Sequence, residues 1–251
     1  MQRDALIRYL RDQLHTARLN LPRVYATADP ENLHRFRVAL RRTRSLLQLY
    51  LPESHTLLDT IRTVFKPTNI LRELDLLLLS LEKSSYPKLY EAFQSYRDER
   101  YRLVVTQIYI EQSMRLLEKL IDELLAIKVV YTDEELINKA LKHYRKTKTA
   151  YKMLTSDSKA KELHRVRIEF KTSRYALEFL KESGLTSEKK KRRYAEQKQD
   201  QLGALHDAYS QLLLLKQFCK ASQLDECRRL YKKRKKAYRR LFRSATSNLS
   251  E

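Results

Sequence analysis

The chain has 251 residues, of which 42% are hydrophobic, and a formal net charge of +21. This composition excludes a disordered polycation, because such chains hold too few apolar residues to form a core. A folded surface with so much positive charge attracts multivalent anions and repels itself without them, so we expect a polyanionic partner. Only 2 glycines and 5 prolines occur. Because these residues interrupt helices, their scarcity predicts long ones.

Three features of the sequence predict the cellular context. The two cysteines, Cys219 and Cys227, are too few for a disulfide framework and indicate a reducing compartment. The N-terminus carries charges where a signal peptide needs an apolar run. No apolar stretch approaches the roughly 20 residues of a membrane span. We therefore expect a cytoplasmic protein without membrane contact.

The first half reads as a series of helices. Expected ranges are 2–20, ending near Pro22, then about 30–51, 53–64 and 69–82, and finally 88–127 as one helix or two. The clearest start is Asp29-Pro30-Glu31, which offers a capping side chain, a proline at the first helical position and an acid in the first turn.

The second half repeats this organisation. Thr132 and Glu135 form a capping box for a helix over about 133–154. Further helices are expected from a cap at Ser156 or Asp157 to Ser183-Gly184, from Thr186 or Ser187 to about 220, and from Ser222 to near Ala245. An all-α protein built by internal duplication follows, with residues 1–127 and 128–251 each forming an antiparallel bundle of roughly four helices.

Two basic segments carry the strongest functional signal. His34 is followed by Arg37, Arg41 and Arg44, and 130 residues later His164 is followed at the same spacings by Arg167, Lys171 and Arg174. At about 100° per residue, each set occupies one arc of a helix face. The apolar residues of both helices share another arc and are expected in the core: Phe36, Ala39, Leu40, Leu46, Leu47, Tyr50, Val166, Phe170, Ala176, Leu177 and Leu180.

At these residues the sequence resembles the conserved histidine α-helical domain (CHAD) family. The first copy matches the family pattern through His34, Arg37, Arg41, Arg42 and Arg44, and the second through His164, Arg167, Lys171, Arg174-Tyr175 and the run Ala176-Leu177-Glu178-Phe179. Each copy is followed by a short motif, which we expect to form a loop. The second motif is intact as Leu202-Gly203-Ala204-Leu205-His206-Asp207, and the first is altered to Leu71-Arg72-Glu73-Leu74-Asp75.

The resemblance spans about residues 1–245 and implies a single domain of two four-helix bundles related by a pseudo-two-fold axis, whose basic helices face a shared central groove. It also implies binding of inorganic polyphosphate. The residues it assigns to binding are His34, Arg37, Arg41, Arg42, Arg44, His164, Arg167, Lys171 and Arg174. Further anion contacts are expected from Arg35, Arg165, Arg72, His206, Lys190 and Arg193. We expect Glu73, Asp75 and Asp207 to orient arginines or cap helix ends.

Polyphosphate chemistry fits these residues. The polymer carries about one charge per phosphate and no bases, and the planar guanidinium of arginine bridges phosphate oxygens while it stays charged. A phosphate neighbour favours the protonated form of histidine, so binding should tighten towards pH 6. The basic runs 189–193 and 232–236 either extend the anion-binding surface or are solvated.

Three alternatives stay open. Nucleic-acid binding is the main one, because charge alone does not exclude it, although the chain has no tryptophan and no glycine-rich loop. A helical metal phosphohydrolase would use His164, His206-Asp207 and Asp225. Histidine phosphotransfer from a helical bundle is the third. We expect a binding protein without catalysis, metal or other cofactor.

Overall fold

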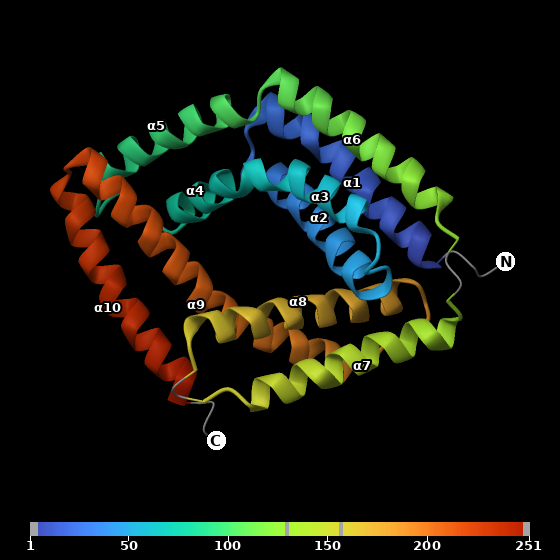
Figure 1. Ribbon diagram of the computed structural model, residues 1–251. Helices are drawn as coiled ribbons and strands as arrows, with labels where there is room; N and C mark the ends of the chain where they lie inside the picture. Colours follow the sequence, from blue (N-terminus) through green and yellow to red (C-terminus); the bar gives the residue numbers. More distant parts are fainter. Residues whose placement is uncertain (1–4, 129–130, 156–157, 248–251) are drawn as a thin grey trace.

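The computed structural model describes residues 5–128, 131–155 and 158–247, and its regular structure within these ranges is entirely helical. The helices are α1 (Ala5–Thr27), α2 (Pro30–Tyr50), α3 (His55–Phe65), α4 (Asn69–Leu79), α5 (Pro87–Val104), α6 (Gln107–Ala126), α7 (Asp133–Lys152), α8 (Ala160–Glu182), α9 (Lys189–Ser222) and α10 (Asp225–Ser247). A 3₁₀ turn, Lys66–Thr68, joins α3 to α4. In Figure 1, α2 and α4 face α8 and α9 across the middle of the molecule.

Several predicted helix ends are confirmed. The Asp29 carboxylate accepts a 2.9 Å hydrogen bond from the Glu31 backbone N–H at the start of α2. Thr132 and Glu135 form the expected capping box of α7. Helix α8 ends at Glu182, followed by Ser183 and by Gly184 with φ +72°, a conformation that favours glycine.

Other predicted ends are wrong. Helix α1 passes through Pro22 and ends at Thr27, because Leu21 and Val24 are buried on either side of the proline and hold the helix in the core. The segment 88–127 is two helices, and the Thr106 hydroxyl caps α6 by accepting from the Tyr109 N–H at 3.1 Å.

The observed ends of the last two helices also differ from the predicted ones. Helix α9 begins at Lys189 rather than at Thr186 or Ser187, and Ser222 is its last residue rather than the start of α10. Gln223, with φ 54°, ends α9 in the left-handed conformation. The predicted caps Ser156 and Asp157 lie outside the described residues.

The two short motifs expected to form loops are helical. Residues 71–75 belong to α4 and residues 202–207 to α9. Gly203 is buried in α9 where that helix passes α8, and a Cβ there would meet Arg167 Nε at 3.8 Å, an ordinary contact. The motifs therefore present side chains at helix spacing, as the basic segments do.

The predicted core of the basic helices is confirmed, since every apolar residue assigned to it is buried. Phe179 of α8 packs edge-on against Tyr9 of α1 and Tyr50 of α2, with ring centroids 5.2 Å and 5.8 Å apart. Burial of large aromatic side chains stabilises such contacts strongly. These rings join the two basic helices through their apolar faces.

Packing does not follow the predicted division at residues 127 and 128. The main core draws on α1, α2, α3 and α6 together with α7, α8 and α9. A second core joins α4 and α5 to α9 and α10, with Phe93 stacked on Phe218 at 4.0 Å between ring centroids. Both cores thus combine the two halves. Duplication into two four-helix bundles stays a prediction.

The prediction for the cysteines is wrong. Cys219 near the end of α9 and Cys227 at the start of α10 form a disulfide across the α9–α10 turn. The number of cysteines did not reveal that a tight helical hairpin places these two side by side. The disulfide removes the argument for a reducing compartment. Within the described residues, no helix has the length and apolar character needed to cross a membrane.

Candidate functional site: a cationic cleft between α2, α4, α8 and α9

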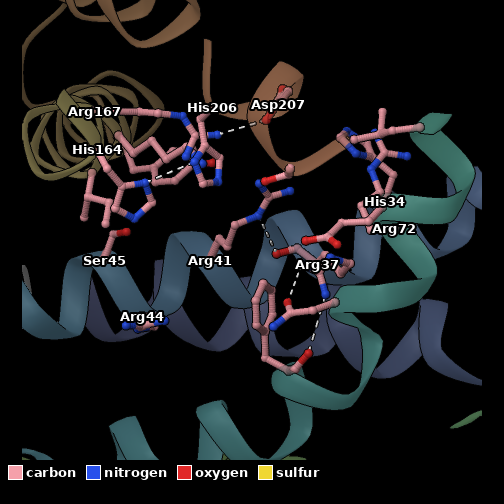
Figure 2. A pocket seen from close by; sticks show the side chains of 18 of the residues that line it. His34, Arg37, Arg41, Arg44, Ser45, Arg72, His164, Arg167, His206 and Asp207 are labelled. Carbon is pink, nitrogen blue, oxygen red and sulfur yellow. Dashed lines mark hydrogen bonds and ion pairs between the residues drawn. The ribbon is translucent and has the colours of Figure 1, made fainter. Parts of the chain in front are cut away.

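A cleft of about 510 Å³ lies between the two basic helices. Its walls come from α2, α4, α8 and α9, with Phe65 at the end of α3. The charged and histidine side chains that line it are His34, Arg37, Arg41, Arg44, Arg72, Glu73, His164, Arg167, Lys171, His206 and Asp207. Figure 2 shows His164, Arg167 and His206 on one side, His34 and Arg72 on the other, and Arg41 between them. The structure thus brings together most residues of both basic segments.

Arg37 is the most firmly held of these cations. Its guanidinium donates to the Thr68 hydroxyl at 2.6 Å and to the Asn69 side-chain oxygen at 2.8 Å, and it lies over the Phe65 ring at 4.0 Å. Arg37 Nε is buried and has no partner among the described residues. The 3₁₀ turn between α3 and α4 therefore fixes one positive charge against the wall of the cleft.

The opposite wall contains a histidine pair. Nδ1 of His164 and Nδ1 of His206 are 3.2 Å apart, and beside them Arg167 donates to the Asp207 carboxylate at 3.4 Å. A contact between two ring nitrogens requires one to donate and the other to accept. At least one of these Nδ1 atoms is therefore unprotonated in the free cleft.

Most cations of the cleft have no counter-charge in the part of the chain that the structure describes. Among the described residues, no carboxylate lies within ion-pair distance of Arg37, Arg41, Arg44, Arg72 or Lys171. Glu73 and Asp207 are the acids in the lining, and of these only Asp207 forms an ion pair with another described residue, Arg167. The cleft therefore concentrates positive charge in a partly desolvated space.

The pKa values respond to this crowding. Burial, followed by repulsion from Arg167 and Arg41, lowers the pKa of Lys171 to about 7, and burial with repulsion from neighbouring cations lowers that of Arg37 to about 9. Burial and then the charge of Arg167 lower the pKa of His206 to about 4. Burial and nearby cations also lower the pKa values of His34 and His164. The negative charge of a polyanion in the cleft would raise these pKa values again.

Binding of an anion should consequently be coupled to proton uptake. Since the pKa of Lys171 is about 7 in the free cleft and higher beside an anion, affinity should rise as pH falls from 9 towards 7. One linked proton gives at most about a tenfold change per pH unit. Titrations with polyphosphate at pH 7, 7.5 and 8 test this, because they stay below the pKa of about 9 to which Arg37 falls. Lys171→Arg, which stays charged, should flatten the profile, and an equally steep profile in that variant would contradict the assignment.

Other residues predicted to bind anions lie elsewhere. Arg42 and Arg174 are absent from the lining because both pair with Glu178, at 3.0 Å and 2.7 Å, and Arg174 also pairs with Glu196. Together with Glu178 they link α2 to α8 and so hold the cleft walls together.

The remaining predicted cations are on the surface. Arg35 pairs with Glu31 on the exposed side of α2, and Arg165 is exposed on α8. Lys190 and Arg193 are exposed in the first turns of α9, where the helix rise puts Arg193 about 20 Å from His206. The run 232–236 belongs to α10, where Lys232, Lys235 and Lys236 form part of a separate basic surface.

The three acids differ in position. Glu73 and Asp207 line the cleft, where burial raises the pKa of Glu73. Asp75 orients an arginine as predicted, but the arginine is Arg97 of α5, at 2.7 Å, outside the cleft.

Sequence reasoning missed several polar lining residues. Four of them follow a lining residue by four positions and so continue its helix face: Ser45 after Arg41, Gln48 after Arg44, Ser210 after His206 and Gln211 after Asp207. That spacing was available in the sequence. Phe65 and Asn69 gave no such signal, because the 3₁₀ turn that places them in the wall breaks the helix period.

The described residues offer no ligand cluster for the metal phosphohydrolase alternative. Among the described residues, no group of three or more His, Cys, Asp or Glu side chains is arranged to hold a metal ion. His164 and His206 contact each other, while Asp207 pairs with Arg167.

The fold and the cleft together define an all-helical domain with a cationic cleft shared by two basic helices. The chain belongs to the CHAD domain family, whose model matches residues 8–216. It is also similar to a structure described as the crystal structure of the CHAD domain from the plant Ricinus communis, with a TM-score of 0.80 and 19% sequence identity, over 100% of this chain and 89% of that one. No curated protein sequence matches the chain.

Proposed function

We propose that the cleft binds inorganic polyphosphate without turning it over. The observation that carries this proposal is a set of cleft cations that form no ion pair within the described part of the chain: Arg37, Arg41, Arg44, Arg72 and Lys171. Arg44 is exposed, but the other four are buried or half-buried, and leaving them without counter-charges costs free energy unless an anion occupies the cleft. Membership of a family linked in general to polyphosphate supports the same ligand.

Unpartnered polar atoms add support. His34 Nδ1, Arg37 Nε and Arg167 Nε belong to lining residues, are buried and have no hydrogen-bond partner among the described residues. Buried donors normally find acceptors. Phosphate oxygens can supply several acceptors at once, and a linear polymer repeats them along the cleft.

Nucleic acid is the alternative that shares the same electrostatics. Among the described residues, the aromatic side chains of the cleft lining are Phe65, whose ring Arg37 covers, and Tyr175, which is buried, so the walls offer no platform on which several bases could stack. A polymer with bases would therefore gain little over one that consists of phosphates alone. We expect polyphosphate to bind more tightly than duplex DNA at equal phosphate concentration.

A competition titration near physiological salt tests this expectation. Labelled long-chain polyphosphate is bound first, and unlabelled polyphosphate, inorganic triphosphate or duplex DNA is added. We expect polyphosphate to compete best and its affinity to fall steeply with salt, because each neutralised phosphate releases counterions. DNA that competes as well as polyphosphate would favour nucleic acid. Phosphate release from the bound polymer would contradict binding without catalysis.

Localisation follows from the same proposal. A protein that binds long polyphosphate should gather where that polymer accumulates, in cytoplasmic polyphosphate granules. Co-localisation of the tagged protein with the granules, lost when Arg41 and Lys171 are replaced by alanine, is the expected result.

A further inference from the structure

A second pocket, apolar and of about 420 Å³, adjoins the cationic cleft between α8, α9 and α10. Its lining consists of Lys161, Leu163, His164, Leu202, Leu205, His206, Tyr209 and Tyr238. The three leucines are buried, whereas Tyr209 is 44% exposed. Pockets of this size commonly hold small organic ligands. We call it the tyrosine pocket.

The histidine pair connects the tyrosine pocket to the cleft, since His164 and His206 line both. On α8, Leu163 immediately precedes His164 and faces the tyrosine pocket, while Arg167 and Lys171 follow it along the cleft. The helix rise puts Lys171 about 10 Å from His164. A ligand of that length can therefore place one end among cations and the other among apolar side chains.

From this juxtaposition we propose that the site also accepts nucleoside 5′-oligophosphates, with the phosphates in the cleft and the base in the tyrosine pocket. The inference rests on the proposed function, because it uses the same cations for the phosphate chain. It extends that function by naming a second class of ligand, one with a planar aromatic end.

Aromatic side chains favour a base as the occupant. The rings of Tyr209 and Tyr238 lie 5.8 Å apart at 41°, and the exposed ring of Tyr209 offers a surface for stacking. Stacking on such rings suits any base, because every base has a π-face. Polar atoms at the edge of a base would find Lys161 and the histidine pair in the same lining. A purely aliphatic chain would use neither the ring faces nor these polar groups.

The experiment compares ATP with inorganic triphosphate by isothermal titration without divalent cations. Charge alone would make triphosphate bind more tightly than ATP. We expect stacking of the base to reverse this order, so that ATP binds roughly fivefold more tightly or better. Tyr209→Ala should abolish the advantage of ATP and leave triphosphate affinity unchanged. Tyr25→Ala is the matched control, because Tyr25 is 49% exposed on α1 and lies outside both the cleft and the tyrosine pocket.

Each outcome separates the two proposals. Failure of long-chain polyphosphate to bind would contradict the polyphosphate cleft itself. Tight triphosphate binding with weaker or equal ATP binding would overturn only the nucleotide inference. An equal loss of affinity for both ligands in Tyr209→Ala would do the same. So would a farnesyl group that raises the affinity of farnesyl diphosphate over inorganic diphosphate by more than adenosine raises the affinity of ATP over triphosphate.

Discussion

Replacing Arg41 and Lys171 together with alanine is expected to weaken polyphosphate binding on the order of 100-fold. Both side chains line the cleft, from α2 and α8, and neither has an ion pair among the described residues. Each charge-assisted hydrogen bond to a phosphate contributes about 1.5 kcal/mol or more, so the loss of two accounts for this factor. Fluorescence titration at fixed salt and pH measures it, and the slope of log affinity against log salt should fall by about 2.

The same double variant should not lose stability. The charge of Arg41 helps to lower the pKa of Lys171, and Arg41 also repels Arg37 and Arg167. Removing two mutually repelling cations from a partly buried cleft therefore removes charge repulsion from the free protein. We expect a Tm equal to or above that of the wild type. This result would separate loss of ligand contacts from unfolding, which would lower both affinity and Tm.

A charge-matched control distinguishes the cleft from the general surface charge. Arg35→Ala combined with Arg193→Ala also removes two positive charges, but both residues are exposed outside the cleft. We expect a change in polyphosphate affinity of less than about fivefold, from the weaker long-range attraction alone. Equal losses in the two double variants would mean that net charge, rather than the cleft, determines binding.

The helix faces of α2 and α8 could be predicted from sequence because they depend on local spacing alone. Each histidine and the cations three and seven positions later do line one cleft. The cation ten positions later lines it only in the first copy, as Arg44. Four residues further on, the first copy has Gln48 and the second has Glu178, an acid that pairs with Arg174 at 2.7 Å. The carboxylate thus takes Arg174 away from the cleft.

Long-range partners explain the remaining differences. Glu178 also accepts a hydrogen bond from Arg42 of α2, which lies 136 positions away in the sequence, and no local pattern predicts that pairing. Both cores combine helices from the two halves, so the way α4 and α5 pack on α9 and α10 could not follow from the repeat. The repeat predicts which helix faces carry charge. Tertiary packing decides which of those charges remain available to a ligand.

Replacing Asp75 is expected to lower stability strongly, because its carboxylate is a buried junction. Its side chain has 0% exposure; one oxygen accepts from Arg97 Nε at 2.7 Å and the other from the Tyr101 hydroxyl at 2.7 Å. Arg97 also donates to the Ala28 carbonyl at 2.6 Å. The junction therefore ties α4 and α5 to the turn between α1 and α2.

Asp75→Asn should lower the free energy of unfolding by about 3 kcal/mol. The change leaves the Arg97 guanidinium, which is 10% exposed, without its buried counter-charge, and breaking a buried pair typically costs this much. Urea unfolding followed by circular dichroism measures the loss. Asp98→Asn is the matched control, because Asp98 contacts the same arginine at 3.1 Å but is 50% exposed, and we expect a loss below about 1 kcal/mol.

The position of Asp75 predicts that the Asp75→Asn substitution affects stability and not binding. Asp75 is absent from the lining of the cleft, although it belongs to the same motif as Arg72 and Glu73, which line it. Under conditions in which Asp75→Asn stays folded, polyphosphate affinity should therefore match the wild type. A variant that is folded yet binds much more weakly would show that the junction also positions Arg72 through α4.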